Sequence, residues 1–260
     1  MKYPIVLVHG IAAIDRTTLF DFWGRIPDEL RKQGIEVFFG NTDAWGDYKS
    51  NAALLKERIE KILRETKKDK VNIIAHSKGG IDSRYLIWKY KFGDKVASLI
   101  TISTPHQGAE LADFVLKQKP IHSILAKKTM KMFGKLFLDQ NPNPYKTLQQ
   151  ISTENMKSFN ETVLEDKNVY YKSLYTIMNN SFDDFMFFFT HWYLKKVVGR
   201  NDGVVSEKSA AWGNNSKEIK GYRGGISHTE IVDIKKKKIS GIDIPDIYKS
   251  LVDELEKHGF

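Results

Sequence analysis

The sequence contains no cysteine among its 260 residues. Disulfide bonds, thiolate nucleophiles and cysteine-ligated zinc sites are therefore excluded. Long apolar runs are also missing. The most apolar later stretch, Phe185 to Val198, is interrupted by His191, Lys195 and Lys196 and is shorter than a bilayer span. The sequence therefore predicts no transmembrane segment.

No secretory leader is visible at the start of the sequence. Met1-Lys2-Tyr3 runs directly into the apolar stretch Pro4 to Val8, which is too short for the apolar region of a signal peptide. We therefore expect a cytoplasmic protein by default, although a secreted chain that has already lost its leader would look the same.

Acidic residues are fewer than basic ones, 32 against 41, which leaves a formal net charge of +9. Such an excess favours anionic partners, either lipid surfaces or nucleic acid. No helix-turn-helix, RNA-binding or zinc-finger pattern is present, so we predict no nucleic-acid partner. The run of four lysines at 235–238 is typical of a solvated loop.

Short apolar runs alternate with stretches of helical periodicity along most of the chain. The expected strands lie at 4–9, 35–39, 71–75, 96–102, 169–177 and 216–222. The expected helices lie at 51–65, 80–92 and 246–258. Strands that alternate with helices in this way predict right-handed βαβ units and an open, mostly parallel α/β sheet with helices on both faces.

Residues 109–165 interrupt this alternation with sequence rich in Lys, Met and Phe. We interpret them as a helical insertion over the carboxyl edge of the sheet, within a single domain of residues 1–260. The insertion has an apolar set and a basic set of positions: Ile121, Ile124, Leu125, Met132, Phe133, Leu136 and Phe137, and Lys127, Lys128, Lys131 and Lys135. This pattern fits a helix that adsorbs to anionic lipid, and equally a helix with one buried face and solvated lysines.

Ser77 lies in the sequence IIAHSKGG, with Ala75 and Gly79 two positions away on either side. Small residues are needed at those positions when a nucleophilic serine occupies a sharp turn from a strand into a helix. An apolar strand precedes Ser77 and an amphipathic helix follows it, so the sequence predicts a nucleophile rather than a loop hydroxyl.

His9-Gly10-Ile11 follows the first expected strand. Acyl transfer needs two backbone N–H donors for the developing oxyanion, one after the nucleophile and one after an early strand. We assign these donors to Lys78 and Ile11, with Gly10 allowing a close backbone approach. Because backbone groups would act, the side chains of these two residues should matter little.

A serine nucleophile requires a base and an acid further along the chain. Of the later histidines, His228 lies in a polar loop, whereas His191 lies in the aromatic run FMFFFTHWYL, so we favour His228. His9 and His76 adjoin the oxyanion loop and the nucleophile and are expected to make structural hydrogen bonds. The expected acid is Asp202, with Asp183 and Asp184 as rivals.

The motifs YPIVLVHG, AHSKGG, ISTPHQGAELAD, NDGVVS and ISHTEIVD resemble, in order and spacing, those of bacterial triacylglycerol lipases of the Pseudomonas, Burkholderia and Proteus type. The resemblance implies an α/β-hydrolase fold, Ser77 as nucleophile, Asp202 as acid and His228 as base. It also implies an oxyanion hole from Ile11 and Lys78, supported by His9, Gly10 and Gly79, and a lid formed by the insertion.

The same resemblance implies a structural calcium site, although no cofactor is required for the chemistry. The matching positions are Glu230, where the family has aspartate, and Asp183 or Asp184. Downstream oxygen ligands are absent, since Ile234 and then lysines follow. The zinc subdomain of some thermophilic relatives would need a histidine-containing insertion near 41–52, and none is present.

The predicted function is hydrolysis of lipid carboxylic esters, of triacylglycerol type, through an acyl-enzyme. Two alternatives stay open: a short-chain carboxylesterase or phospholipase with the same triad, and a non-catalytic relative that binds lipid. Phe185, Phe187, Phe188 and Phe189 would either line an acyl pocket or pack in the core.

Overall fold

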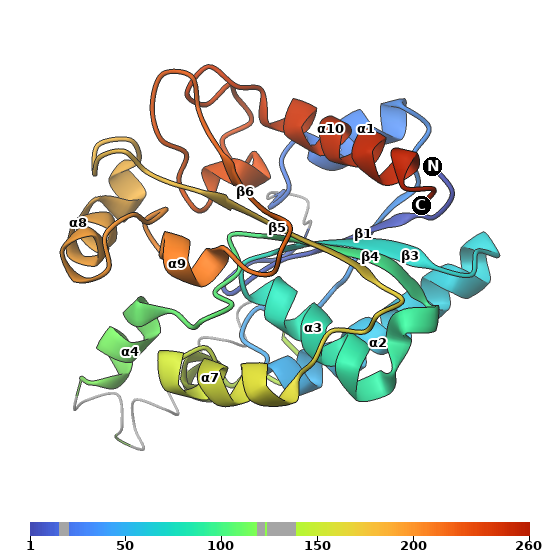
Figure 1. Ribbon diagram of the computed structural model, residues 1–260, viewed down its shortest axis with the longest axis horizontal. Coiled ribbons are helices and arrows are strands. Elements are labelled where there is room, and N and C mark those ends of the chain that lie inside the picture. Colours follow the sequence, from blue (N-terminus) through green and yellow to red (C-terminus); the bar gives the residue numbers. More distant parts are fainter. Residues whose placement is uncertain (16–20, 119–122, 124–138) are drawn as a thin grey trace.

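The computed structural model describes residues 1–15, 21–118, 123 and 139–260 (Figure 1). Its centre is a six-stranded sheet in which every neighbouring pair is parallel, in the order β2-β1-β3-β4-β5-β6. The strands are β1 (Ile5–Val8), β2 (Val37–Phe39), β3 (Val71–His76), β4 (Val96–Ile102), β5 (Tyr170–Thr176) and β6 (Ser216–Ile219). The predicted α/β-hydrolase architecture is confirmed.

Helices cover both faces of this sheet (Figure 1). One face carries α1 (Ile26–Lys32) and α10 (Ile244–Lys257), and the other carries α2 (Tyr48–Thr66) and α3 (Lys78–Tyr90). Alternate residues of β1 separate the two cores, because successive side chains of a strand point to opposite faces. Ile5 and Leu7 pack toward the first pair of helices, and Val6 and Val8 toward the second.

The remaining elements follow the carboxyl ends of the strands or connect them. The helices are α4 (Glu110–Leu116), α6 (Pro144–Gln150), α7 (Thr153–Thr162), α8 (Phe188–Val197) and α9 (Glu207–Ala210). Short 3-10 turns are η1 (Phe92–Asp94), η3 (Phe185–Phe187) and η4 (Glu230–Val232). Across the described ranges, no helix combines the length and the apolarity needed to cross a bilayer.

The predicted insertion, 109–165, contains α4, α6 and α7 in its described parts and no strand there. The residues predicted to form an interfacial helix fall within 119–122 and 124–138, which lie outside the described residues. Core packing, one of the two expectations for the Phe185 to Phe189 segment, is wrong for Phe185 and Phe189, which are 76% and 79% exposed, and the lining of an acyl pocket stays a prediction.

Candidate active site

Ser77 is the single residue between the end of β3 and the start of α3. Its backbone has φ 53° and ψ −131°, a conformation that costs a residue other than glycine about 1–3 kcal/mol. The turn brings three chain segments close together. A Cβ on Gly79 would lie 2.5 Å from the carbonyl oxygen of His9, and a Cβ on Gly10 only 2.7 Å from Ser77 Cβ. The packing therefore requires the small residues that the sequence has.

Ser77, His228 and Asp202 lie in one hydrogen-bonded series although they are far apart in the sequence. His228 Nε2 is 3.0 Å from Ser77 Oγ, and His228 Nδ1 is 2.8 Å from Asp202 Oδ2. The other carboxylate oxygen of Asp202 accepts the N–H groups of Val204 and Val205 at 3.0 and 2.8 Å. All three side chains are buried. The structure thus brings together the three residues predicted from the sequence.

The rival residues lie elsewhere and have other partners. His191 contacts Ser181 Oγ at 2.8 Å and the carbonyl oxygen of Met178 at 3.2 Å. Asp183 accepts backbone N–H groups of its own turn, and Asp184 accepts the hydroxyl of Ser227 at 2.6 Å. Among the described residues, none of these three rivals contacts Ser77.

The two histidines next to the site make the structural contacts expected of them. His9 places its ring nitrogens 2.8 Å from the carbonyl oxygen of Gly10 and 2.9 Å from that of Thr42. His76 Nε2 donates to the carbonyl oxygen of His228 at 2.8 Å. Burial lowers the pKa of His76 well below 6.5, and the neighbouring His228 imidazole adds to this effect. His76 is therefore a neutral brace on the backbone of His228.

The expected oxyanion donors are the backbone N–H groups of Ile11 and Lys78. Lys78 directly follows Ser77, and Gly10, the residue before Ile11, packs against the Ser77 side chain. Neither N–H group has an acceptor among the described residues. Both N–H groups are therefore available as donors, and their use as an oxyanion hole stays a prediction.

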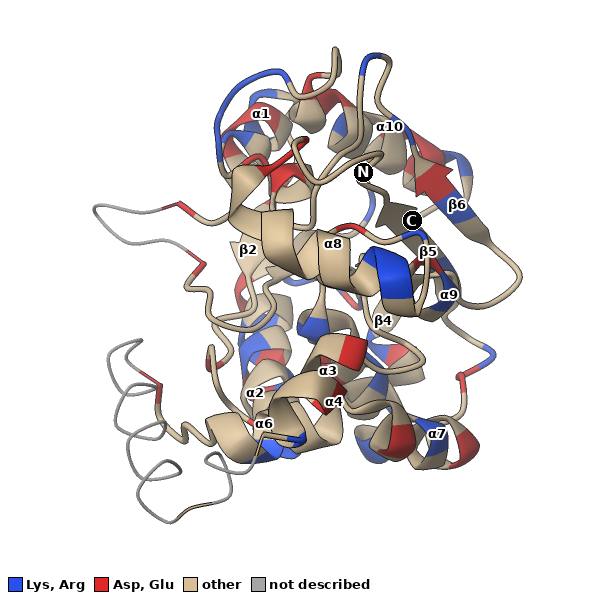
Figure 2. Cartoon of the chain, turned by 90° about the vertical axis from the view of Figure 1, so that its left-hand side faces the viewer, with Lys and Arg blue, Asp and Glu red and all other residues tan. Residues whose placement is uncertain are grey.

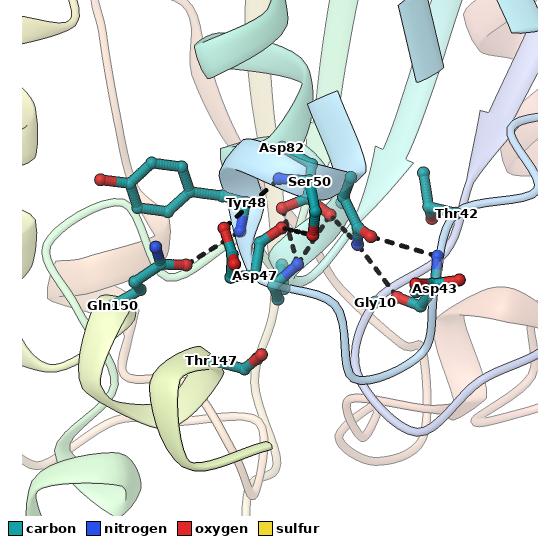
Figure 3. Close-up of polar contacts among 12 residues, drawn as sticks. Gly10, Thr42, Asp43, Asp47, Tyr48, Ser50, Asp82, Thr147 and Gln150 are labelled. Carbon is teal, nitrogen blue, oxygen red and sulfur yellow. Dashed lines mark hydrogen bonds and ion pairs between the residues drawn. The ribbon is translucent and has the colours of Figure 1, made fainter. Parts of the chain in front are cut away.

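The side chain of Lys78 contradicts the expectation that its identity matters little. Its ammonium is buried and lies 2.7 and 2.8 Å from the two carboxylate oxygens of Asp82. Asp82 in turn accepts from Asn51, which also exchanges hydrogen bonds with the backbone of Asp43 (Figure 3). The Asp43 carboxylate accepts the N–H groups of Gln140 and Asn141 at 2.9 and 2.7 Å.

The candidate calcium residues do not fit a metal ion. Asp184 and Glu230 both contact the ammonium of Lys235, at 3.2 and 2.7 Å, and Asp183 is turned toward backbone N–H groups. Calcium needs carboxylate lone pairs that face the ion, whereas these oxygens already face N–H and O–H donors. Nor do the described parts of the chain hold any group of three or more acidic or histidine side chains suited to a metal.

Comparison with known proteins places the chain among lipases and esterases. The sequence profile of the palmitoyl protein thioesterase family matches residues 4–175. Triacylglycerol lipase 2 of Saccharomyces cerevisiae is 28% identical over 92% of this chain and 74% of its own length. A triacylglycerol lipase of Burkholderia plantarii is 36% identical over 52% of this chain, but the match covers only 40% of that lipase.

Solved structures agree with this result. The mature form of the Bacillus licheniformis lipase BlEst2 superimposes with a TM-score of 0.67 and 27% identity, over 90% of this chain and 88% of that one. The resemblance to bacterial triacylglycerol lipases is confirmed.

Proposed function

The chain belongs to the palmitoyl protein thioesterase family, and from this membership and its similarity to lipases we propose that it hydrolyses fatty acyl esters with Ser77, His228 and Asp202 as its catalytic residues. The observation that carries the assignment is the hydrogen-bonded series from Ser77 Oγ through the His228 imidazole to Asp202, with distances of 3.0 and 2.8 Å. No cofactor takes part in the chemistry.

In the first half of the reaction, His228 Nε2 takes the hydroxyl proton of Ser77 while Ser77 Oγ attacks the ester carbonyl carbon. The carbonyl oxygen becomes an oxyanion that accepts from the N–H groups of Ile11 and Lys78. Asp202 holds the Nδ1–H of His228 and stabilises the imidazolium. His228 then gives its proton to the leaving alcohol, and the acyl group remains on Ser77.

In the second half, water takes the place of the alcohol. His228 takes a proton from the water molecule, whose oxygen attacks the acyl-serine carbonyl through the same oxyanion geometry. The imidazolium returns the proton to Ser77 Oγ, and the fatty acid leaves. Both halves require His228 to keep its ring orientation, which Asp202 and the brace from His76 maintain.

Exposed apolar side chains on η3 and α8 support a lipid interface as the place of reaction. In the cartoon, α8 carries no red segment, and its blue lysines lie at one end (Figure 2). We define the α8 surface as the exposed aromatic and methionine side chains of this region: Phe182, Phe185, Met186, Phe189 and Trp192. Contiguous exposed apolar side chains on a single chain mark interaction sites. Lys195 and Lys196 occupy the last turn of α8, so that apolar burial and attraction to anionic headgroups would add.

A second candidate substrate is a fatty acyl thioester, because the matching family profile is that of palmitoyl protein thioesterases. The same serine chemistry cleaves either bond, since only the leaving atom differs. A palmitoyl oxygen ester and a palmitoyl thioester with similar leaving groups, compared by kcat/KM, distinguish the two candidates.

The decisive experiment replaces Ser77 with alanine. We expect Ser77→Ala to lower kcat on soluble esters by at least about a thousandfold while leaving the thermal unfolding midpoint near that of the parent. A panel of esters of rising acyl length then separates a lipase from a short-chain esterase, which would lose activity on long chains. Hydrolysis by Ser77→Ala at the parent rate would refute the assignment.

A further inference from the structure

Lys235 lies where two loops of the candidate active site meet. Its ammonium is 2.7 Å from Glu230 Oε1 and 3.2 Å from Asp184 Oδ2. The two carboxylates are buried, whereas the lysine side chain is 33% exposed and reaches them from the surface. A single cation therefore lies between two buried carboxylates that come from different parts of the chain.

The same two carboxylates hold the residue that precedes His228. Asp184 Oδ2 accepts from the hydroxyl of Ser227 at 2.6 Å, and Glu230 Oε2 accepts from the backbone N–H of Ser227 at 2.9 Å. The Ser227 hydroxyl is also 3.3 Å from the backbone nitrogen of Glu230. Ser227 is fixed from both sides, and the position of His228 follows from that of its neighbour.

Two like charges brought together in a buried place repel each other unless a cation lies between them. Burial opposes the charged form of Lys235, but the hydrogen bonds and the negative charges of Glu230 and Asp184 outweigh it and raise the pKa of the ammonium. Lys235 is therefore an ammonium at neutral pH.

We propose that the Lys235 ammonium is a built-in cation that joins the Asp184 and Glu230 carboxylates and so positions His228, in place of a bound calcium ion. The positioning of His228 matters only if His228 is the catalytic base, so this part of the proposal rests on the proposed function. The contact of the ammonium with the two carboxylates concerns folding alone. Lys235 is a positioning residue, since its contacts reach His228 only through Ser227.

The test compares Lys235→Met with Lys237→Met, which removes the same charge from an exposed neighbour. Thermal unfolding and calorimetric titration with calcium chloride are measured on each protein without substrate, and again with a chelator. We expect the parent and Lys237→Met to be indifferent to calcium and to the chelator. Lys235→Met should melt at a lower temperature and regain part of the difference when calcium is added.

Kinetics on a soluble short-chain ester supply the second measurement. We expect Lys235→Met to lower kcat about tenfold with little change in KM, and Lys235→Arg to retain most of the parent kcat. Two results would overturn the proposal. The first is a calcium effect on thermal unfolding and calorimetric titration that is the same in the parent and in Lys235→Met, whether large or absent. The second is an unchanged kcat in a folded Lys235→Met. If the parent hydrolyses no ester but its unfolding temperature is still independent of calcium, the proposed function is refuted. The comparison of unfolding temperatures would then still test the role of Lys235 in folding.

Discussion

At the scale of single residues, Lys78 has two roles, one for its backbone and one for its side chain, and the sequence predicted only the first. Its backbone N–H is a proposed oxyanion donor, and its side chain forms a fully buried ion pair with Asp82. Burial raises the pKa of Asp82, while the ammonium of Lys78 and the amide of Asn51 act in the opposite direction. Removal of the lysine charge would leave that carboxylate buried without a partner.

We predict that Lys78→Met lowers the free energy of unfolding at neutral pH by about 3–5 kcal/mol. Because a raised carboxyl pKa means that the folded state binds the proton more tightly, the contribution of Asp82 to stability falls as pH rises above its unfolded value of 3.8. The deficit of Lys78→Met should therefore be smallest near pH 4 and grow toward neutrality. Urea unfolding across this pH range measures it.

The double variant Lys78→Met with Asp82→Leu is the matched control, because it removes both charges and leaves no unpaired carboxylate. It should recover most of the lost stability. Equal stability of Lys78→Met and the parent at neutral pH would show that this ion pair does not hold the turn after Ser77.

Among the single residues, the three side chains of the proposed triad were predictable and their supports were not. Ser77, Asp202 and His228 carry local signals, because Ser77 has small neighbours at the end of a strand, Asp202 precedes a glycine and His228 lies in a polar loop. Lys235 carried none. It opens a run of four lysines that favoured a solvated loop, and only its approach to Asp184, 51 positions earlier, distinguishes it from Lys237 and Lys238.

At the scale of elements, α10 is joined to the sheet by a polar contact as well as by its apolar face. The ammonium of Lys172 on β5, a largely buried side chain, lies 2.6 and 2.5 Å from the two carboxylate oxygens of Glu254 on α10. Tyr170 also donates to Glu254 at 3.0 Å. Burial alone would raise the pKa of Glu254, but the contacts with Lys172 and Tyr170 outweigh it and lower that pKa.

We predict that Glu254→Gln lowers the free energy of unfolding at neutral pH by about 1–2 kcal/mol, since Glu254 is one-third exposed and the charge of Lys172 loses its partner. A lowered carboxyl pKa gives stability that is present above the unfolded value of 4.5 and is lost as pH falls through the folded pKa. The gap between parent and variant should therefore close in acid. Thermal unfolding at stepped pH values measures it.

Asp253→Asn is the control for this prediction, because Asp253 is the exposed neighbour of Glu254 on the same helix. It should shift stability little at any pH. A Glu254→Gln deficit that persists unchanged in acid would contradict the ion-pair explanation.

Periodicity predicted the strands and the long helices because each of them buries apolar side chains at a fixed spacing. The ends of β1, β3 and β4 and the helices α2, α3 and α10 lie close to their expected ranges. The aromatic segment at 182–192 was not predictable in this way. Its aromatic residues predict burial, yet most of them face outward, and no pattern within the segment distinguishes a buried apolar face from an exposed one.

At the scale of the whole molecule, the proposed attraction to lipid has two separate sources, the net charge of +9 and the α8 surface. Charge attraction acts over a Debye length and is screened by salt, whereas burial of aromatic rings is not. An anionic vesicle should therefore be bound by both, and a zwitterionic vesicle chiefly by the aromatic side chains.

We predict that the double variant Phe185→Ser, Phe189→Ser weakens adsorption to anionic and to zwitterionic vesicles by at least about tenfold, because each ring contributes over 1 kcal/mol when buried in the interface. Added salt should weaken binding to anionic vesicles only. Hydrolysis of a soluble short-chain ester should stay at the parent rate. Cosedimentation with vesicles of each composition measures the binding. Leu164→Ser, at an apolar position that is 67% exposed and lies outside the α8 surface, is the control. If Leu164→Ser weakens adsorption as much as the double variant, the α8 surface is not the lipid contact.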